Sequence, residues 1–312
     1  MTSSAPPKPV LSLGDRVFSR SAIFAGSMIL VTLAAVAIFL IVQSLPAFVA
    51  NGESASLLTD NFWSYVGPLI FGTVWAAVLA LLVSLPVSIG IALFISHYAP
   101  RKAAAVLGYI VDLLAAVPSV VFGLWGITVL APAAQPVFVW FNKYLGWIPL
   151  FGGDPSGTGR TILTAALVLG VMILPIMTAI CREVFLQAPV LHEEAALALG
   201  ATRWEMIKLA VLPFGRPGIV SAAMLGLGRA LGETMAVAMV LSASGIVTFR
   251  LLTSENPSTI AANIALMFPE AYGQNINVLI ATGLILFVVT FLVNALARWI
   301  VSRRAEFNGA AG

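Results

Sequence analysis

Long stretches of the chain carry no charged residue, and these stretches define its architecture. Residues 21–52 and 61–100 contain no Asp, Glu, Lys or Arg. Apolar stretches of about 18 or more residues are typical of helices that cross hydrocarbon roughly 30 Å thick. We therefore predict six membrane-spanning helices, located near residues 22–45, 66–95, 113–130, 161–180, 218–246 and 275–296.

The same stretches favour an all-α protein over a membrane barrel. Barrel strands alternate polar and apolar residues, whereas these stretches are apolar on every face. Backbone groups in lipid must be hydrogen-bonded within the chain, so the spans are predicted to be helices. We predict a membrane domain over 22–301 with tails at 1–21 and 302–312. Residues 131–160, rich in Pro, Gly and aromatic side chains, are predicted to be a loop.

Composition agrees with a protein embedded in lipid and excludes several other classes. Hydrophobic residues make up 60% of the 312 and charged residues 9%, against about 25% charged residues in a soluble domain. The formal charge is +3, but the basic residues form no cluster that would indicate nucleic-acid binding. Cys181 is the single cysteine, and no metal-ligand spacing surrounds it. We expect no disulfide, no metal and no cofactor.

The distribution of basic residues predicts which side faces the cytoplasm, because cytoplasmic loops carry an excess of Lys and Arg. Twelve lie on one side of the predicted spans: Lys8, Arg16, Arg20, Arg101, Lys102, Arg182, Arg203, Lys208, Arg216, Arg298, Arg303 and Arg304. Three lie on the other side: Lys143, Arg160 and Arg250. We therefore place both termini and the segment 182–216 in the cytoplasm.

The segment 182–216 is polar, rich in Ala and helical in pattern, and it contains no span. A short helix is predicted over 194–199, because Gly200 can take the left-handed conformation that ends a helix. A second helix is predicted from Thr202, which is a suitable N-cap with Glu205 three residues later. Two short helices that meet at a glycine form a knob suited to the groove of a soluble partner.

This segment also carries a family pattern. The residues that form it are Glu194, Ala195, Ala196, Gly200, Leu212 and Pro213. The pattern resembles the EAA loop of ABC importer permeases, which inserts into the cytoplasmic ATPase subunit. The resemblance implies that these residues couple the chain to an ATPase and that the fold is that of a type I ABC importer permease. The alternative is an ordinary amphipathic helix in a loop.

Two further segments resemble the permeases of the phosphate-specific ABC importer, and among those the PstC type. They read AVPSVVFGLWG over 116–126 and GRALGETMA over 228–236. The resemblance covers nearly the whole chain and implies a non-catalytic permease that moves inorganic phosphate across the bacterial inner membrane. It also implies three partners: a second permease of the PstA type, an ATPase dimer of the PstB type and an external phosphate-binding protein of the PstS type.

Arg229 and Glu233 are charged residues inside the fifth predicted span. Arg229 lies 13 residues beyond Arg216, about 20 Å along a helix at 1.5 Å per residue. A charge at the bilayer centre costs roughly 2.5–3.5 kcal/mol on insertion scales, so such residues are retained for function or are paired. The i to i+4 spacing predicts that both side chains share one helical face and reach each other.

Two interpretations of this pair remain open. Arg229 can attract an anion with its fork of donors while Glu233 prevents tight trapping, or the pair can be a salt bridge that only fixes helix packing. Ser119 and Thr234 can add hydroxyl contacts to the anion, or serve helix packing alone. The expected substrate-pathway residues are therefore Arg229, Glu233, Thr234 and Ser119, and no catalytic residue is expected.

The remaining polar residues point to no separate activity. The glycine-rich stretch 152–161 lacks the Lys and Ser/Thr spacing of a phosphate-binding loop, so we expect ATP to be hydrolysed in separate subunits. His97 and His192 are expected to be solvated histidines without partners, and Asp112 an interfacial residue. An importer for another oxyanion remains open. So does an ion-coupled secondary transporter, although no inverted repeat is evident.

Overall fold

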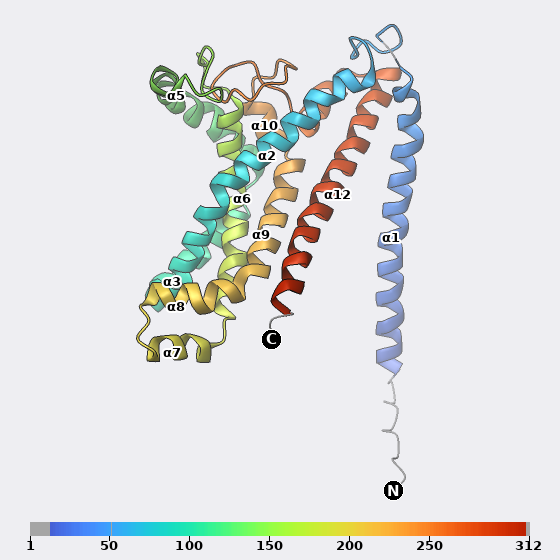
Figure 1. Cartoon of the computed structure of the whole chain (residues 1–312). Helices are drawn as coiled ribbons and strands as arrows, with labels where there is room; N and C mark the ends of the chain where they lie inside the picture. The colour runs from blue at the N-terminus through green and yellow to red at the C-terminus, as the bar shows by residue number, and fades with distance from the viewer. Residues whose placement is uncertain (1–12, 51, 310–312) are drawn as a thin grey trace.

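The computed structural model describes residues 13–50 and 52–309, and these residues fold into helices without a strand (Figure 1). The α-helices are α1 (Leu13–Phe48), α2 (Phe62–Leu93), α3 (Arg101–Ala115), α4 (Ser119–Trp125), α5 (Ala131–Leu145), α6 (Ile162–Leu186), α7 (Val190–Ala198), α8 (Arg203–Met206), α9 (Leu212–Gly232), α10 (Met235–Val240), α11 (Ile260–Met267) and α12 (Gln274–Gly309). The π-helical turns η1 (Phe94–Tyr98), η2 (Gly126–Leu130) and η3 (Ile207–Val211) continue α2, α4 and α8. A 3-10 turn, η4 (Phe268–Glu270), follows α11.

In the described part of the chain, six helical stretches are long and apolar enough to cross a membrane. They are Gly14–Phe48, Phe62–Tyr98, Ser119–Leu145, Ile162–Leu186, Arg203–Gly232 and Gln274–Trp299. The prediction of an all-α membrane protein with six spans is confirmed, although two of the expected spans follow the chain differently from the prediction.

The helix α6 lies at the centre of the bundle, with α2 and α9 packed against it (Figure 1). Of its most apolar window, 67% is buried. Gly226 of α9 faces Met177 of α6 so closely that an added Cβ would lie 2.7 Å from the sulfur atom. Gly218 faces Val184 in the same way. Small residues at helix contacts let the backbones approach closely in a membrane, and this packing builds the core.

By contrast, α1 stands apart from the bundle along most of its length (Figure 1). No residue of its most apolar window is buried. It joins the rest at one end, where Phe48 packs edge-on against Phe62 with ring centroids 5.1 Å apart. Ala47 and Val278 belong to the same small cluster of buried side chains. The helix is therefore anchored at one end and uncovered over the remainder.

The third expected span, 113–130, does not follow one helix, because α3 ends at Ala115 and α4 begins at Ser119. Pro118 lies between them, and proline cannot continue the hydrogen bonding of a preceding helix. Gly108 of α3 lies beside Arg182 near the end of α6, and Gly126 lies beside Val168 near its start. The two pieces together therefore run along the length of α6.

The loop expected at 131–160 is helical in its first half. The helix α5 covers Ala131–Leu145 and continues directly from the π-helical turn η2, with one of its prolines at the junction of the two. The prediction of a loop gave proline too much weight and overlooked this position. Residues 146–161 form the turns that were expected.

The fifth expected span, 218–246, also breaks. The helix α9 ends at Gly232, and Glu233 takes an extended conformation with φ −69° and ψ 129°. The short helix α10 follows, and none of residues 241–259 is helical. Within this segment, 251–253 and 256–259 are nevertheless buried, among them Leu252 and Asn256, which are both 0% exposed, whereas 243–247 are exposed.

The buried side chain of Asn256 holds this non-helical segment in place. Its Oδ1 accepts a hydrogen bond of 3.2 Å from the backbone N–H of Ile162, at the start of α6. Its Nδ2 donates to the carbonyl oxygens of Thr253 at 2.9 Å and Ser242 at 3.3 Å. Buried backbone groups are costly when unpaired. The side-chain amide of Asn256 provides partners for three backbone groups that have none within a helix.

Replacing Asn256 is expected to destabilise the fold strongly. Asn256→Ala leaves three buried backbone groups without partners at about 1–3 kcal/mol each, so the free energy of unfolding should fall by roughly 3 kcal/mol or more. Asn256→Asp should be no better, because its carboxylate would face two carbonyl oxygens. The control is Asn294→Ala, expected within about 0.5 kcal/mol. Unfolding of the purified chain in detergent measures both, and equal stability of the two alanine variants would contradict this account.

The described ends of the chain lie on one side of the bundle. The start of α1 and the end of α12 lie at the same end of the molecule as α7 and α8, while α5 and α10 lie toward the opposite end (Figure 1). This arrangement agrees with an even number of spans. Which end faces the cytoplasm remains the prediction made from the basic residues.

That orientation predicts the accessibility of introduced cysteines. In a Cys181→Ala background, a cysteine at Gly157, which is exposed and has open space around it, should react with an impermeant thiol reagent added outside cells. A cysteine at the exposed Lys102 should react only after the membrane is opened. Labelling followed by mass measurement tests both positions, and the reverse pattern would invert the assigned orientation.

Candidate functional site

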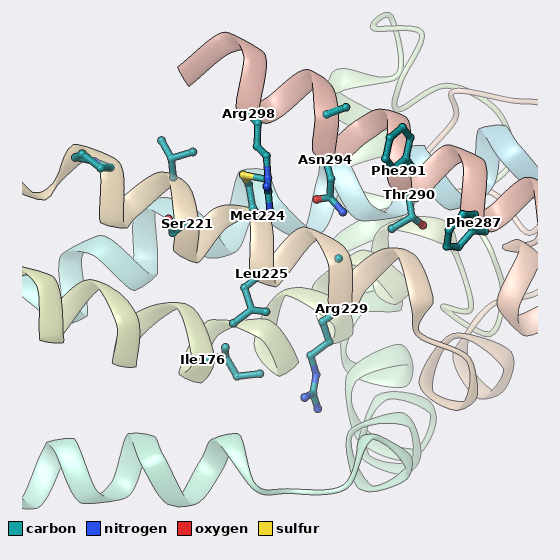
Figure 2. Close-up of a pocket in the computed structure, with 14 residues that line it drawn as sticks. Ile176, Ser221, Met224, Leu225, Arg229, Phe287, Thr290, Phe291, Asn294 and Arg298 are labelled. Atoms are coloured by element: carbon teal, nitrogen blue, oxygen red, sulfur yellow. The ribbon is translucent and has the colours of Figure 1, made fainter. Parts of the chain in front are cut away.

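Arg229 lies one turn before the end of α9 and lines a groove of about 1340 Å³ between α6, α9 and α12. Its side chain is half-buried, and its Nε atom is buried with no hydrogen-bond partner. Figure 2 shows the side chain leaving α9 on the side opposite α12, whereas Asn294 and Arg298 extend from α12 toward α9. A cationic group with an unpartnered donor therefore lines this groove near the end of α9.

The predicted ion pair between Arg229 and Glu233 is not formed. The described residues form two ion pairs, and neither includes these side chains. The reason is that α9 ends at Gly232, so Glu233 does not share a helical face with Arg229. Instead, Oε1 of Glu233 accepts a 3.1 Å hydrogen bond from the backbone N–H of Ala236. The carboxylate therefore caps α10 and leaves Arg229 unneutralised.

The other two predicted pathway residues lie at the two breaks. Thr234 follows Glu233, and its hydroxyl donates to the carbonyl oxygen of Gly232 at 3.2 Å. Ser119 is the first residue of α4, directly after the break at 116–118. The two short helices pack together, since an added Cβ on Gly123 would lie 2.9 Å from Cα of Ala236. This packing brings the breaks in α3–α4 and α9–α10 into one region of the bundle.

The knob predicted in segment 182–216 has the expected local structure. Gly200 has φ +87°, the left-handed conformation that ends α7. Thr202 caps α8, and the carboxylate of Glu205 accepts a 2.8 Å hydrogen bond from the backbone N–H of Thr202. No residue of α7 is buried, and Leu199 is 90% exposed. An apolar side chain presented in this way suits a partner surface.

The remaining residues of the family pattern lie around the same knob. Glu194 and Ala195 are exposed on α7, whereas Ala196 packs against the core. Leu212 and Pro213 are the first two residues of α9. The pattern therefore spans the knob and the helix that carries Arg229.

His97 departs from the prediction of a solvated histidine without partners. It lies in η1, at the end of α2, with its side chain 10% exposed. Its Nδ1 lies 2.7 Å from Oγ of Ser96, and its Nε2 lies 3.5 Å from Oε1 of Glu193 on α7. The partner is 96 residues away, and no local pattern signals such a contact. His192, by contrast, is exposed.

The comparisons with known proteins agree with these features. Residues 84–306 match the family of binding-protein-dependent transport system inner membrane components. The phosphate transport system permease protein PstC 2 of Mycobacterium tuberculosis is 47% identical over 305 residues, which cover 94% of this chain and 93% of that protein. PstC of Mycobacterium leprae is 45% identical, covering 86% of this chain and 88% of that protein.

A likeness to a solved structure concerns the fold alone. A chain in the crystal structure of a bacterial ABC transporter that imports the acidic polysaccharide alginate superposes with a TM-score of 0.63 at 20% identity. The match covers 92% of this chain and 96% of that chain. The predicted fold of an ABC importer permease is confirmed.

The chain belongs to the family of binding-protein-dependent transport system inner membrane components. It is a multi-pass protein of the inner membrane, as its six spans and its family indicate. The resemblance to ABC importer permeases is thereby confirmed, whereas the coupling role of segment 182–216 stays a prediction.

The cap on α10 yields a testable difference between two substitutions of Glu233. Glu233→Gln keeps an oxygen that can accept from Ala236, whereas Glu233→Ala removes the cap at about 0.5–2 kcal/mol. We expect faster hydrogen exchange at the α10 amides in the alanine variant alone. Glu255→Ala, in an exposed position, is the control. Fast exchange in the glutamine variant as well would mean that the carboxylate charge, and not the cap, matters.

Proposed function

We propose that this chain is a permease subunit of an ABC importer that carries inorganic phosphate across the bacterial inner membrane. The observation that carries the proposal is its 47% identity, over nearly its whole length, to a protein named as a phosphate transport system permease. ATP hydrolysis belongs to separate subunits in this proposal. The chain supplies the pathway and the contact that transmits movement to it.

We further propose that Arg229 contacts the anion during passage. Its guanidinium carries a charge that no described carboxylate neutralises, because Glu233 caps α10 instead. The fork of donors in arginine matches the oxygens of phosphate. An intramembrane charge is a functional site by default, since it is costly to retain. Ser119 and Thr234, at the two neighbouring breaks, supply hydroxyl groups that can donate to the same anion.

The exposed surfaces of the chain support the partners that we propose. The knob of α7 and α8 is proposed to dock into an ATPase dimer of the PstB type through Glu194, Ala195 and Gly200. The uncovered α1 is suited to contact a second permease of the PstA type. An external phosphate-binding protein of the PstS type would deliver the substrate at the opposite face.

The role of Arg229 is tested by uptake of labelled phosphate, normalised to the amount of assembled complex. Arg229→Gln should reduce uptake by about tenfold or more, because hydrogen bonds to charged groups contribute about 1.5–3 kcal/mol each. Arg229→Lys should be intermediate, since it keeps the charge and loses the fork. Lys143→Gln, a loss of the same charge on the exposed face of α5, is the control.

Two outcomes would count against the proposal. Uptake by Arg229→Gln equal to that of the control would leave Arg229 as a packing residue. Uptake of labelled sulfate that exceeds uptake of phosphate would keep the importer and the role of Arg229 but change the substrate to another oxyanion. ATPase activity stimulated by phosphate in the reconstituted complex provides an independent measurement of coupling.

A further inference from the structure

A second cavity, of about 610 Å³, lies at the end of the bundle that carries α7 and α8. It is open to the surface and bounded by η1, α3 and the last turn of α6. Its polar lining residues are Ser96, Arg101, Tyr109, Asp112 and Arg182. Neither Arg229 nor the groove beside α12 belongs to it, so it is a separate site from the proposed phosphate pathway.

Arg182 faces this cavity with most of its donors unused. Its side chain is 19% exposed, and its Nε atom is buried without a hydrogen-bond partner. Its charged partner among the described residues is Asp112, with Nη2 and Oδ2 3.7 Å apart. That distance exceeds the 2.7–2.9 Å of a charge-assisted hydrogen bond. Asp112 is itself 55% exposed, so water weakens the attraction between the two charges.

The position of the guanidinium depends on Gly108. A Cβ added to Gly108 would overlap Nη1 of Arg182. The glycine therefore lets the guanidinium of Arg182 lie against the backbone of α3, in the wall of the cavity. This arrangement pre-orients the cation at no cost to a ligand that arrives later.

A second cation converges on the same cavity. Arg101 is the first residue of α3, and it takes part in none of the ion pairs of the described residues. The N-cap of α3 is Pro100, which has no side-chain group to cap the first-turn N–H groups. These free N–H groups and the helix dipole favour an anion at this end of α3. With Arg101, Arg182 and Asp112, the formal charge of the cavity is +1.

The surroundings favour a ligand that belongs to the membrane. Beside the cavity, α3 exposes Val106, Ile110 and Leu113, which are 59%, 44% and 59% exposed. Tyr109, which lines the cavity, is 70% exposed, and tyrosine is enriched at the membrane–water interface. An anionic headgroup with apolar tails matches a basic cavity next to an apolar helix face. Basic pockets between transmembrane helices bind such headgroups.

We propose that this cavity binds a phosphate group through Arg101 and Arg182, and that the phosphate is the headgroup of an anionic phospholipid. Inorganic phosphate offers the same chemistry and is the other source that the experiment must separate. The proposal does not depend on what the chain transports. It assigns to α3 a role in fixing the end of α6 that leads into the knob.

The test titrates phosphatidylglycerol into the full chain, purified with the subunits that accompany it, and counts bound lipid by native mass spectrometry. Arg182→Gln and Arg101→Gln should each weaken binding about tenfold or more. Gly108→Ala should weaken it too, because the added Cβ displaces Arg182 while every charge is kept. Lys102→Gln removes a neighbouring exposed charge that does not line the cavity, so its binding should stay within about twofold of the unchanged chain.

Two further comparisons identify which molecule supplies the bound phosphate group and control for folding defects in the variants. Phosphatidylcholine with the same tails should bind about tenfold more weakly, and inorganic phosphate should not displace phosphatidylglycerol. Displacement by phosphate, with binding lost in Arg182→Gln, would keep the site and change its source. Arg182→Lys is the control for folding defects, because it changes the same position and keeps the charge. It should bind phosphatidylglycerol more tightly than Arg182→Gln. Lipid binding that is equal in Arg182→Gln, Gly108→Ala and Lys102→Gln would overturn the proposal.

Discussion

The side-chain amide of Asn256 makes the interaction on which the membrane domain depends. Backbone groups away from water need partners within the protein, and helices provide them automatically. Residues 241–259 are not helical, and 251–253 and 256–259 among them are buried, so partners for their backbone groups come from backbone groups of other segments and from side chains. Asn256 supplies three hydrogen bonds, and the hydroxyl of Thr73 on α2 accepts another from the N–H of Ile260 at 2.9 Å. These two residues satisfy buried backbone groups that no helix serves.

The site around Arg229 depends on the end of α9 at Gly232. Because the segment after α9 is held by Asn256, α9 can end at Gly232, one turn after Arg229. The break frees Glu233 from the face of Arg229 and sends its carboxylate to the start of α10. Positive charge is thereby left uncompensated next to a second break, which precedes Ser119. Discontinuous helices that meet in this way are a recurrent means of placing polar groups in transporters.

Sequence reasoning reached the number of spans and the form of the knob, because each depends on local signals. Apolar length predicts a span, and Gly200 and Thr202 carry turn and cap chemistry that acts over a few residues. The breaks were harder to predict, since an apolar run such as 218–246 looks the same whether its helix continues or stops. The decision depends on partners far away in the sequence, such as Ile162 for Asn256.

The site residues show the same difference between features that depend on local sequence and features that depend on distant contacts. Arg229 was found because a charge in an apolar run is conspicuous by itself. The i to i+4 rule then assumed a continuous helix, and it failed for Glu233 when the helix ended. His97 was missed because its contact with Glu193 joins segments 96 residues apart. Arg182 and Gly108 also meet only through the packing of α3 against α6.

The uncovered surface of α1 affects the orientation and the stability of this helix in a single copy of the chain. A helix of 36 residues packs on its own bundle at one end, against α12, and lipid or a neighbouring protein must cover the rest. Its orientation is then decided by the assembly and not by the fold of one copy. When a partner binds only the folded form, apparent stability rises with partner concentration. A melting temperature measured on the chain by itself would therefore differ from that of the same chain within its assembly.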